Sequence, residues 1–169
     1  MKEFELNELL NNAGKVDEKI GQYMDKKVIN KLESQKEILG HMAKAEHNLN
    51  FVSEIKDDYN DWTLVACYYA AYHMALALIL TKGYFSKNHD ATLCVLIKYF
   101  YKKELSEDDF RLLNSLDTED ILFYVQSKQE REKASYSSRI LFDKSLVSEM
   151  KLKTRLFVNK AKGIIEDNL

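Results

Sequence analysis

The chain has 169 residues with no proline, where average usage would supply roughly 8, and only 5 glycines. Because these two residues mark turns and strand edges, the composition argues against loop-rich and sandwich folds and predicts an all-α domain of long helices. Lysine and arginine total 25 against 27 acidic residues, which gives a net charge of -2. The chain therefore lacks the global basic field of a nucleic-acid-binding protein, and any such contact must be local.

Residues 1–27 are expected to form a short N-terminal helical arm, either frayed or docked. A few apolar residues give one or two amphipathic turns before the chain is interrupted at 11–14: Phe4, Leu6, Leu9 and Leu10. This start carries acids throughout and no apolar run, so we expect no signal peptide. Cys67 and Cys94 sit in apolar surroundings without a paired motif, and we expect buried thiols in a cytoplasmic protein.

Residues 28–169 are expected to form a single helical bundle. Its first helix is predicted to begin near Val28, because apolar residues recur from there at steps of three, four or seven: Val28, Leu32, Leu39, Met42, Leu49 and Val52. The charged run 56–61 should end that helix and supply Asn60 or Asp61 as the cap of the next one.

Residues 62–81 contain no formal charge, and their number is what a membrane-spanning helix requires. Tyr68, Tyr69, Tyr72 and His73 make the segment polar for a span, and no second apolar run exists. We therefore predict a central bundle helix that is buried nearly all round, and no membrane contact. Gly83 suits the left-handed position that follows a helix.

Four more segments complete the predicted bundle of four to five long helices in an up-and-down arrangement. Asn88 can cap a helix that runs from His89 to about Lys103. Residues 104–120 are acidic and turn-like, with a short helical piece at 110–113. Helices are predicted over 118–139 and 144–166, the last with an apolar stripe: Val147, Met150, Phe157, Val158, Ala161 and Ile165.

Common catalytic signatures are missing from the sequence. It has no glycine-rich phosphate loop, no His-Glu-x-x-His motif and no metal-spaced cluster of cysteine and histidine, so we expect no metal site and no cofactor. His41 and His47 lie among charged neighbours and are expected to be solvated. His73 is expected to be a hydrogen-bonded group of the core.

Lys87, Asn88 and His89 form the first candidate site. They occupy the start of a predicted helix, where backbone N–H groups and basic side chains favour a bound phosphate. The alternative is that Asn88 is only a cap and that His89 belongs to the first turn of the helix.

A second candidate site lies in the segment QEREKASYSSR. Lys128, Arg131 and Ser135 follow Tyr124 at steps of four, three and four along one helical stripe, and Tyr136 flanks it. Arg131 could hold a phosphate through its planar fork of donors. Equally, it could pair with an acidic residue.

Three strings of the sequence together resemble the HEPN domain family: AEHNLNFV, DWTLVACYYAAYHMALALILTKGYFSKNH and REKASY. The similarity covers about residues 28–165. It implies an up-and-down bundle of four or five helices that forms a homodimer. It also implies a toxin–antitoxin type of system in which the partner is a minimal nucleotidyltransferase.

Ribonucleolytic members of that family combine an arginine with a histidine a few residues later. Arg131 matches the arginine, but Tyr136 stands at the histidine position, and a phenol with a pKa near 10 is a poor base at neutral pH. The resemblance therefore implies a non-catalytic dimer that binds a nucleotide, RNA or a partner protein. A metal-independent ribonuclease using Arg131 and His89, with Tyr136 as a third candidate catalytic residue, is one alternative. A purely structural dimerisation scaffold is the other.

Overall fold

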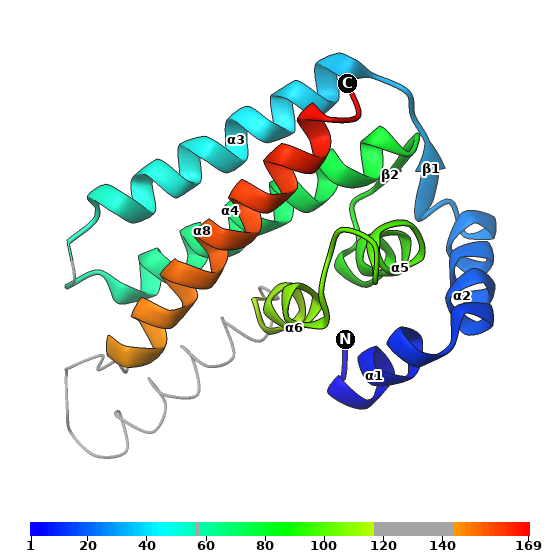
Figure 1. Cartoon of the computed structure of the whole chain (residues 1–169), viewed down its shortest axis with the longest axis horizontal. Helices are drawn as coiled ribbons and strands as arrows, with labels where there is room; N and C mark the ends of the chain where they lie inside the picture. Colours follow the sequence, from blue (N-terminus) through cyan, green and yellow to red (C-terminus); the bar gives the residue numbers. More distant parts are fainter. Residues whose placement is uncertain (57, 117–143) are drawn as a thin grey trace.

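The computed structural model describes residues 1–56, 58–116 and 144–169 (Figure 1). In these ranges the chain is mostly helical, with one small antiparallel sheet, and this confirms the all-α prediction at the level of fold class. The elements are α1 (Glu3–Asn11), α2 (Ala13–Asp25), β1 (Ile29–Lys31), α3 (Gln35–Glu54), α4 (Asn60–Thr81), β2 (Tyr84–Ser86), α5 (His89–Phe100), α6 (Glu107–Ser115) and α8 (Lys144–Glu166).

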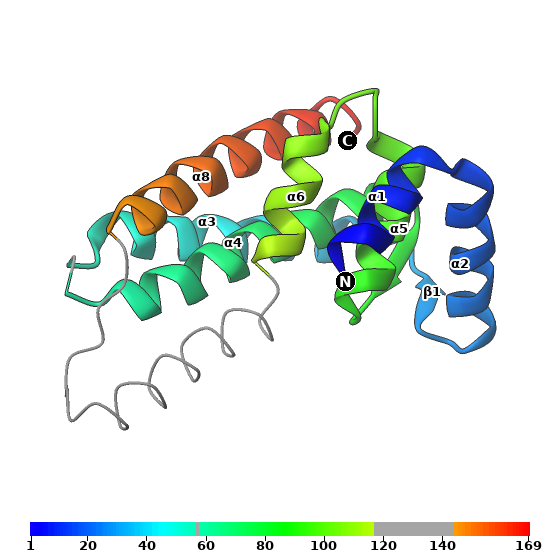
Figure 2. The ribbon, with the colours of Figure 1, turned by 90° about the horizontal axis from the view of Figure 1, so that it is seen from below.

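The helix α4 forms the centre of the molecule. It packs most extensively against α3, with which it forms a helical hairpin, and then against α8, which runs along the same pair (Figures 1 and 2). Fourteen of its 22 residues are buried, and five of these are alanines that let the neighbouring helices approach closely: Ala66, Ala70, Ala71, Ala75 and Ala77. In the described part of the chain, α4 alone is long and apolar enough to cross a membrane, but 72% of its most apolar window is buried. The prediction of a buried central helix is confirmed.

The N-terminal arm is docked on the bundle. Both α1 and α2 contact α5, and α6 lies between α5 and α8 (Figure 2). The arm buries an apolar set against these helices: Leu6, Leu9, Leu10, Val16 and Ile20. Arg111 of α6 adds polar contacts, because its guanidinium pairs with Glu3 and donates to the Asn7 side-chain oxygen at 2.9 Å.

A two-stranded ribbon replaces the expected beginning of the first long helix. The strand β1 pairs with β2, with Ile29 opposite Ser86 and Lys31 opposite Tyr84. The helix α3 begins only at Gln35, after the Ser34 hydroxyl accepts a hydrogen bond from the backbone N–H of Glu37 at 3.3 Å. The prediction of a helix from Val28 is therefore wrong at its first turns, because pairing with a distant strand and the Ser34 cap determine where the helix starts.

Of the other predicted helix boundaries, some agree with the structure and some differ from it. Asn60 and Asp61 lie inside the first turn of α4 and do not cap it, since the cap position is Tyr59. The helix that begins at His89 ends at Phe100, and the acidic segment after it contains the nine-residue helix α6. The bounds of α8 and its buried stripe are confirmed, apart from the half-buried Met150. The helix expected over 118–139 lies outside the described residues.

Candidate functional site

A pocket of about 520 Å³ lies where the end of α2, the ribbon and the start of α5 meet. Its lining is made by six residues: Lys27, Val28, Asn30, Phe85, Lys87 and Asn88. Two of the residues that the sequence proposed for phosphate binding, Lys87 and Asn88, therefore share one pocket. Their partners in it, Lys27 and Asn30, were not predicted.

The register of the ribbon explains how these residues come together. Side chains alternate between the two faces of a strand, and Asn30 pairs directly with Phe85. Asn30 and Phe85 therefore share one face of the ribbon. Val28, two residues before Asn30, and Lys87, two residues after Phe85, lie on the same face. The opposite face carries Lys31 and Tyr84.

Lys27 enters the pocket from an uncommon backbone conformation. Its φ is +56°, in the left-handed region that glycine usually occupies. The backbone N–H of Lys27 donates to the Met24 carbonyl at 2.9 Å, and that of Val28 donates to the Tyr23 carbonyl at 2.8 Å, which is the Schellman pattern that ends α2. The left-handed conformation costs a lysine at this position about 1 kcal/mol of folding free energy relative to glycine.

Asn88 fixes the start of α5 at the rim of the same pocket. Its side-chain oxygen accepts from the backbone N–H of Ala91 at 2.9 Å, so the predicted cap is confirmed. Its own N–H donates to the hydroxyl of the buried Ser86 at 3.0 Å. The positive end of the α5 dipole is thereby held at the pocket in a defined orientation.

The two pocket lysines differ from other described lysines in their ion pairing. In the described residues, neither Lys27 nor Lys87 forms an ion pair, whereas Lys98, Lys160 and Lys162 all do. Two unpaired ammonium groups beside a helix N-terminus favour an anion, and Phe85 supplies an apolar surface next to them.

His89 does not line this pocket. Its ring stacks on α4, with centroids 5.7 Å from Tyr72 and 6.3 Å from Tyr68, and both ring nitrogens are buried. Asn88 is the N-cap and has an extended backbone, whereas His89 is the first residue of the helix, so their side chains have different surroundings although the two are adjacent in sequence. The remaining proposed residues lie outside the described part of the chain: Lys128, Arg131, Ser135 and Tyr136.

Two histidines form a pair between α3 and α4. The Nδ1 atoms of His41 and His73 are 2.9 Å apart, so one ring donates and the other accepts, and the His41 ring lies 6.5 Å from that of Phe85. Burial lowers the pKa of His73 from 6.5 to about 4, helped by His41 and Lys44, and burial also lowers the pKa of His41. His73 is hydrogen-bonded as predicted, but it is half-buried and does not belong to the core. The prediction of a solvated His41 is wrong because α4 supplies it with a partner.

Other polar groups offer less chemistry. His47 is exposed, as expected. Cys67 and Cys94 are free and buried, and burial raises their pKa values to about 11 and about 12, so neither is a ready nucleophile. Among the described residues, no group of three or more histidine, cysteine or acidic side chains could hold a metal ion.

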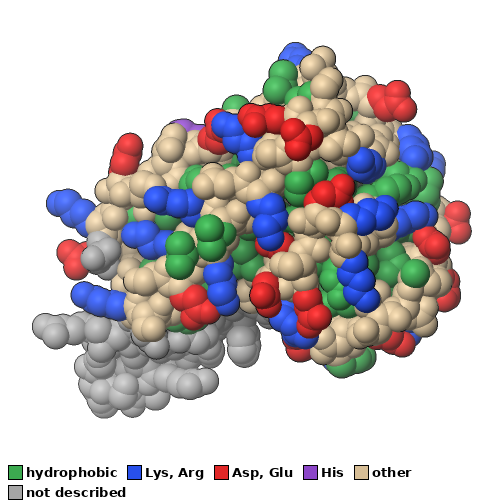
Figure 3. Space-filling model, viewed as in Figure 1, with side chains coloured by type: hydrophobic (Ala, Val, Ile, Leu, Met, Phe, Trp, Pro, Cys, Tyr) green, Lys and Arg blue, Asp and Glu red, His purple; other side chains and the backbone are tan. Residues whose placement is uncertain are grey.

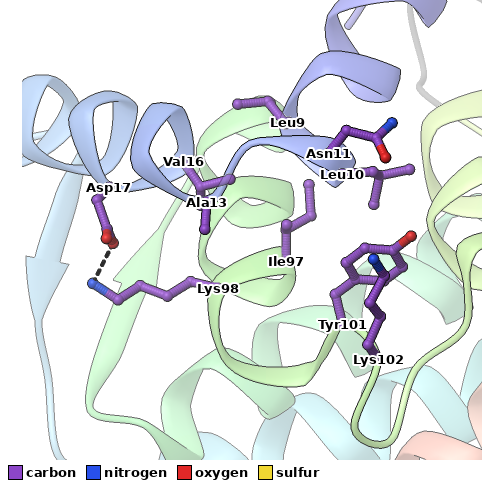
Figure 4. A pocket seen from close by; sticks show the side chains of 10 residues that line it. All are labelled: Leu9, Leu10, Asn11, Ala13, Val16, Asp17, Ile97, Lys98, Tyr101 and Lys102. Atoms are coloured by element: carbon purple, nitrogen blue, oxygen red, sulfur yellow. Dashed lines mark ion pairs between the residues drawn. The ribbon is translucent and has the colours of Figure 1, made fainter.

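A second pocket, of about 460 Å³, separates the arm from α5 (Figure 4). Its walls are about equally polar and apolar. Lys98 in its lining is already paired with Asp17 at 2.7 Å, which leaves Lys102 as its one lysine without an ion pair among the described residues. It therefore offers less free positive charge than the pocket at the start of α5. On the face shown in Figure 3, basic and acidic side chains are interspersed, in agreement with a local rather than an extended site for an anion.

No family model matches the chain, and comparison with curated proteins also finds no match.

Proposed function

We propose that the chain is a non-catalytic, HEPN-like binding protein that recognises a phosphate-bearing ligand, a nucleotide or RNA, in the pocket at the start of α5. One observation carries the proposal: Lys27 and Lys87, both unpaired within the described residues, meet beside the capped N-terminus of α5 in a single pocket. The ammonium groups and the helix dipole attract phosphate, and the Phe85 ring can contact a base or sugar.

The wider setting of the proposal comes from the sequence resemblance. We place the chain in the cytoplasm as a homodimer that works with a minimal nucleotidyltransferase in a toxin–antitoxin type of system. The helical architecture and the free cysteines are compatible with this setting.

The position of His89 favours binding over ribonuclease activity. A general base must reach the 2′-hydroxyl of the RNA, but both nitrogens of this ring are buried beside Tyr68 and Tyr72. RNA cleavage without metal that is lost in His89→Ala, while nucleotide binding persists, would instead support the ribonuclease alternative.

The proposal is tested by fluorescence anisotropy with labelled ATP and a labelled short RNA. Lys87→Ala should weaken binding about tenfold, as expected for loss of one charged contact to phosphate. Lys27→Gly should weaken it similarly while raising the free energy of unfolding by about 1 kcal/mol, because the left-handed backbone is relieved. The matched control is Lys103→Ala, an exposed lysine just beyond the other end of α5.

The outcomes separate cleanly. Unchanged affinity in Lys103→Ala and a reduced salt dependence in the two pocket variants would support the site. Absence of binding to either probe, or equal losses in all three variants, would refute it. Because Lys27→Gly is expected to be more stable than the wild type, its loss of binding cannot be ascribed to unfolding.

A further inference from the structure

Tyr84 lies in a cluster of hydroxyl and ammonium groups on the face of the ribbon opposite the pocket. Lys31 is its direct partner across the two strands, and the lysine Nζ lies 3.4 Å from the centroid of the tyrosine ring. From α5, the hydroxyl of Tyr99 reaches that of Tyr84 at 2.9 Å. The ribbon register and one turn of α5 thus bring three functional groups together from separate parts of the chain.

The hydrogen bond between the two tyrosines has a direction. Tyr99 donates and Tyr84 accepts, so the hydrogen bond stabilises negative charge on the oxygen of Tyr84. Lys31, first, and then the Tyr99 hydroxyl lower the pKa of Tyr84, whereas burial and then Tyr84 raise the pKa of Tyr99 to about 12. Negative charge is therefore favoured on the Tyr84 oxygen over the Tyr99 oxygen, and Tyr99 is the hydrogen-bond donor.

Charged groups from each neighbouring element favour this assignment. Lys31 comes from β1 and Lys98 from α5, and Asp17 from α2 pairs with Lys98 at 2.7 Å (Figure 4). Lys98 also acts to lower the pKa of Tyr84, while Asp17 acts on Tyr99. Two cations against one carboxylate leave the surroundings of Tyr84 positive.

We propose that Tyr84 is a nucleophilic tyrosine, prepared by Lys31 and Tyr99 to accept an activated phosphoryl group on its phenol oxygen. The proposal goes beyond the proposed ligand pocket and does not depend on it. The phenol first releases its proton to solvent while Tyr99 keeps its own. The Tyr84 oxygen then forms a bond to phosphorus, and the bond from phosphorus to the leaving group breaks, with the electron pair going to that group.

The phosphoryl class is chosen because of the charges around the oxygen. The attacked phosphorus carries oxygens that become more negative as the new bond forms. The Lys31 ammonium over the Tyr84 ring would stabilise them, and Lys98 adds positive charge nearby. The same cations would then stabilise the phosphorylated product, which is more negative than the phenol.

The test uses a fluorophosphonate probe on the whole protein, with peptide mapping by mass spectrometry over time. In this reaction the tyrosine oxygen bonds to phosphorus, fluoride leaves, and the phenol proton goes to the buffer. Tyr59 is the internal standard, because its side chain is 53% exposed while Tyr84 is only partly exposed. We expect Tyr84 to be labelled at least about tenfold faster than Tyr59, because the Lys31 cation and the hydrogen bond from Tyr99 favour its phenolate.

Variants separate activation from exposure. Tyr84→Phe should lose the label, Lys31→Met should slow labelling about tenfold, and Lys31→Arg should restore it because the cation returns. Tyr99→Phe should move the pH dependence of Tyr84 labelling upward, since the donated hydrogen bond is lost. Faster labelling of Tyr59 than of Tyr84, or equal rates in wild type and Lys31→Met with unchanged circular dichroism, would overturn the proposal.

Discussion

The paired histidines His41 and His73 show how burial changes the pH at which a residue titrates, because it lowers the pKa of both rings. At neutral pH both rings are uncharged, and their Nδ1 atoms share one proton over 2.9 Å. Protonating the accepting Nδ1 would remove this hydrogen bond and place a cation in a half-buried position, so the pair resists protonation.

Acidification is therefore expected to destabilise the fold through this pair. The folded-state pKa of His73, about 4, lies below its unfolded value of 6.5, so the stability it contributes is present above 6.5 and is lost as the pH falls toward 4. Between about pH 7.5 and about pH 5 the loss should be about 1 kcal/mol, after allowance for screening at a half-exposed site. Urea unfolding at both values measures it.

The matched variant for this prediction is His73→Gln, which keeps a hydrogen-bonding side chain but cannot titrate. It should lose about 1 kcal/mol less than the wild type over the same pH interval. Equal losses in the two proteins would show that other groups account for the acid sensitivity.

At the scale of the elements, the close approach of α3 and α8 to α4 depends on small side chains. Ala70 is fully buried in this layer. Ala70→Leu should lower the free energy of unfolding by about 1–3 kcal/mol, because the added atoms have no space in a packed interior. Ala43→Leu makes the same change at an exposed position of α3 and should have little effect in the same denaturant titration.

A result in which both alanine variants unfold at the same denaturant concentration would contradict the packing of α4 as described. The comparison is informative because the two substitutions add the same atoms to a helix, and only their surroundings differ.

The elements also show what can be read from sequence and what cannot. The helix α8 was predicted with its bounds and most of its buried face, because its signal is a local periodicity. The strand β1 was missed, because its structure depends on pairing with residues beyond two long helices.

In the candidate site, too, features with a local sequence signal can be predicted, and features that depend on distant residues cannot. Lys87 and Asn88 were found because a cap and a lysine are adjacent in the sequence, whereas Lys27 and Asn30 enter the pocket only through the ribbon. His89 was grouped with them by proximity in the chain, yet helical geometry turns its ring toward Tyr68 and Tyr72. The Tyr84 cluster left no local signal, since Lys31 and Tyr99 come from other elements.

At the scale of the whole molecule, the division into an arm at 1–27 and a bundle at 28–169 stays a prediction. Unfolding experiments can measure whether the arm and the bundle unfold in one cooperative transition. Leu9 is buried against the bundle, whereas Phe4 on the same helix is 65% exposed. Leu9→Ala should lower the free energy of unfolding by about 2–4 kcal/mol, and Phe4→Ala should change it little.

Trp62, the single tryptophan, lies in the first turn of α4, and Figure 1 shows this end of α4 far from α1 and α2. Its fluorescence therefore reports on a part of the bundle away from the arm. If arm and bundle unfold as one unit, Trp62 fluorescence and circular dichroism should shift together in Leu9→Ala. A circular dichroism transition that moves while the Trp62 transition stays in place would show that the arm unfolds separately.

The ribbon has a consequence for the order of folding and for local opening. Its three paired residues on each side close a loop that contains the whole α3–α4 hairpin, and the Leu32 N–H extends it by donating to the Gly83 carbonyl at 3.1 Å. Such a closure loses chain entropy, so it is favoured only after the two long helices have brought the strand ends together. The ribbon is therefore expected to form late in folding. Its amide protons should exchange with solvent before those of the α3–α4 hairpin. Since Asn30 and Phe85 line one face and Lys31 and Tyr84 meet on the other, one opening event would dissolve both the pocket wall and the tyrosine cluster.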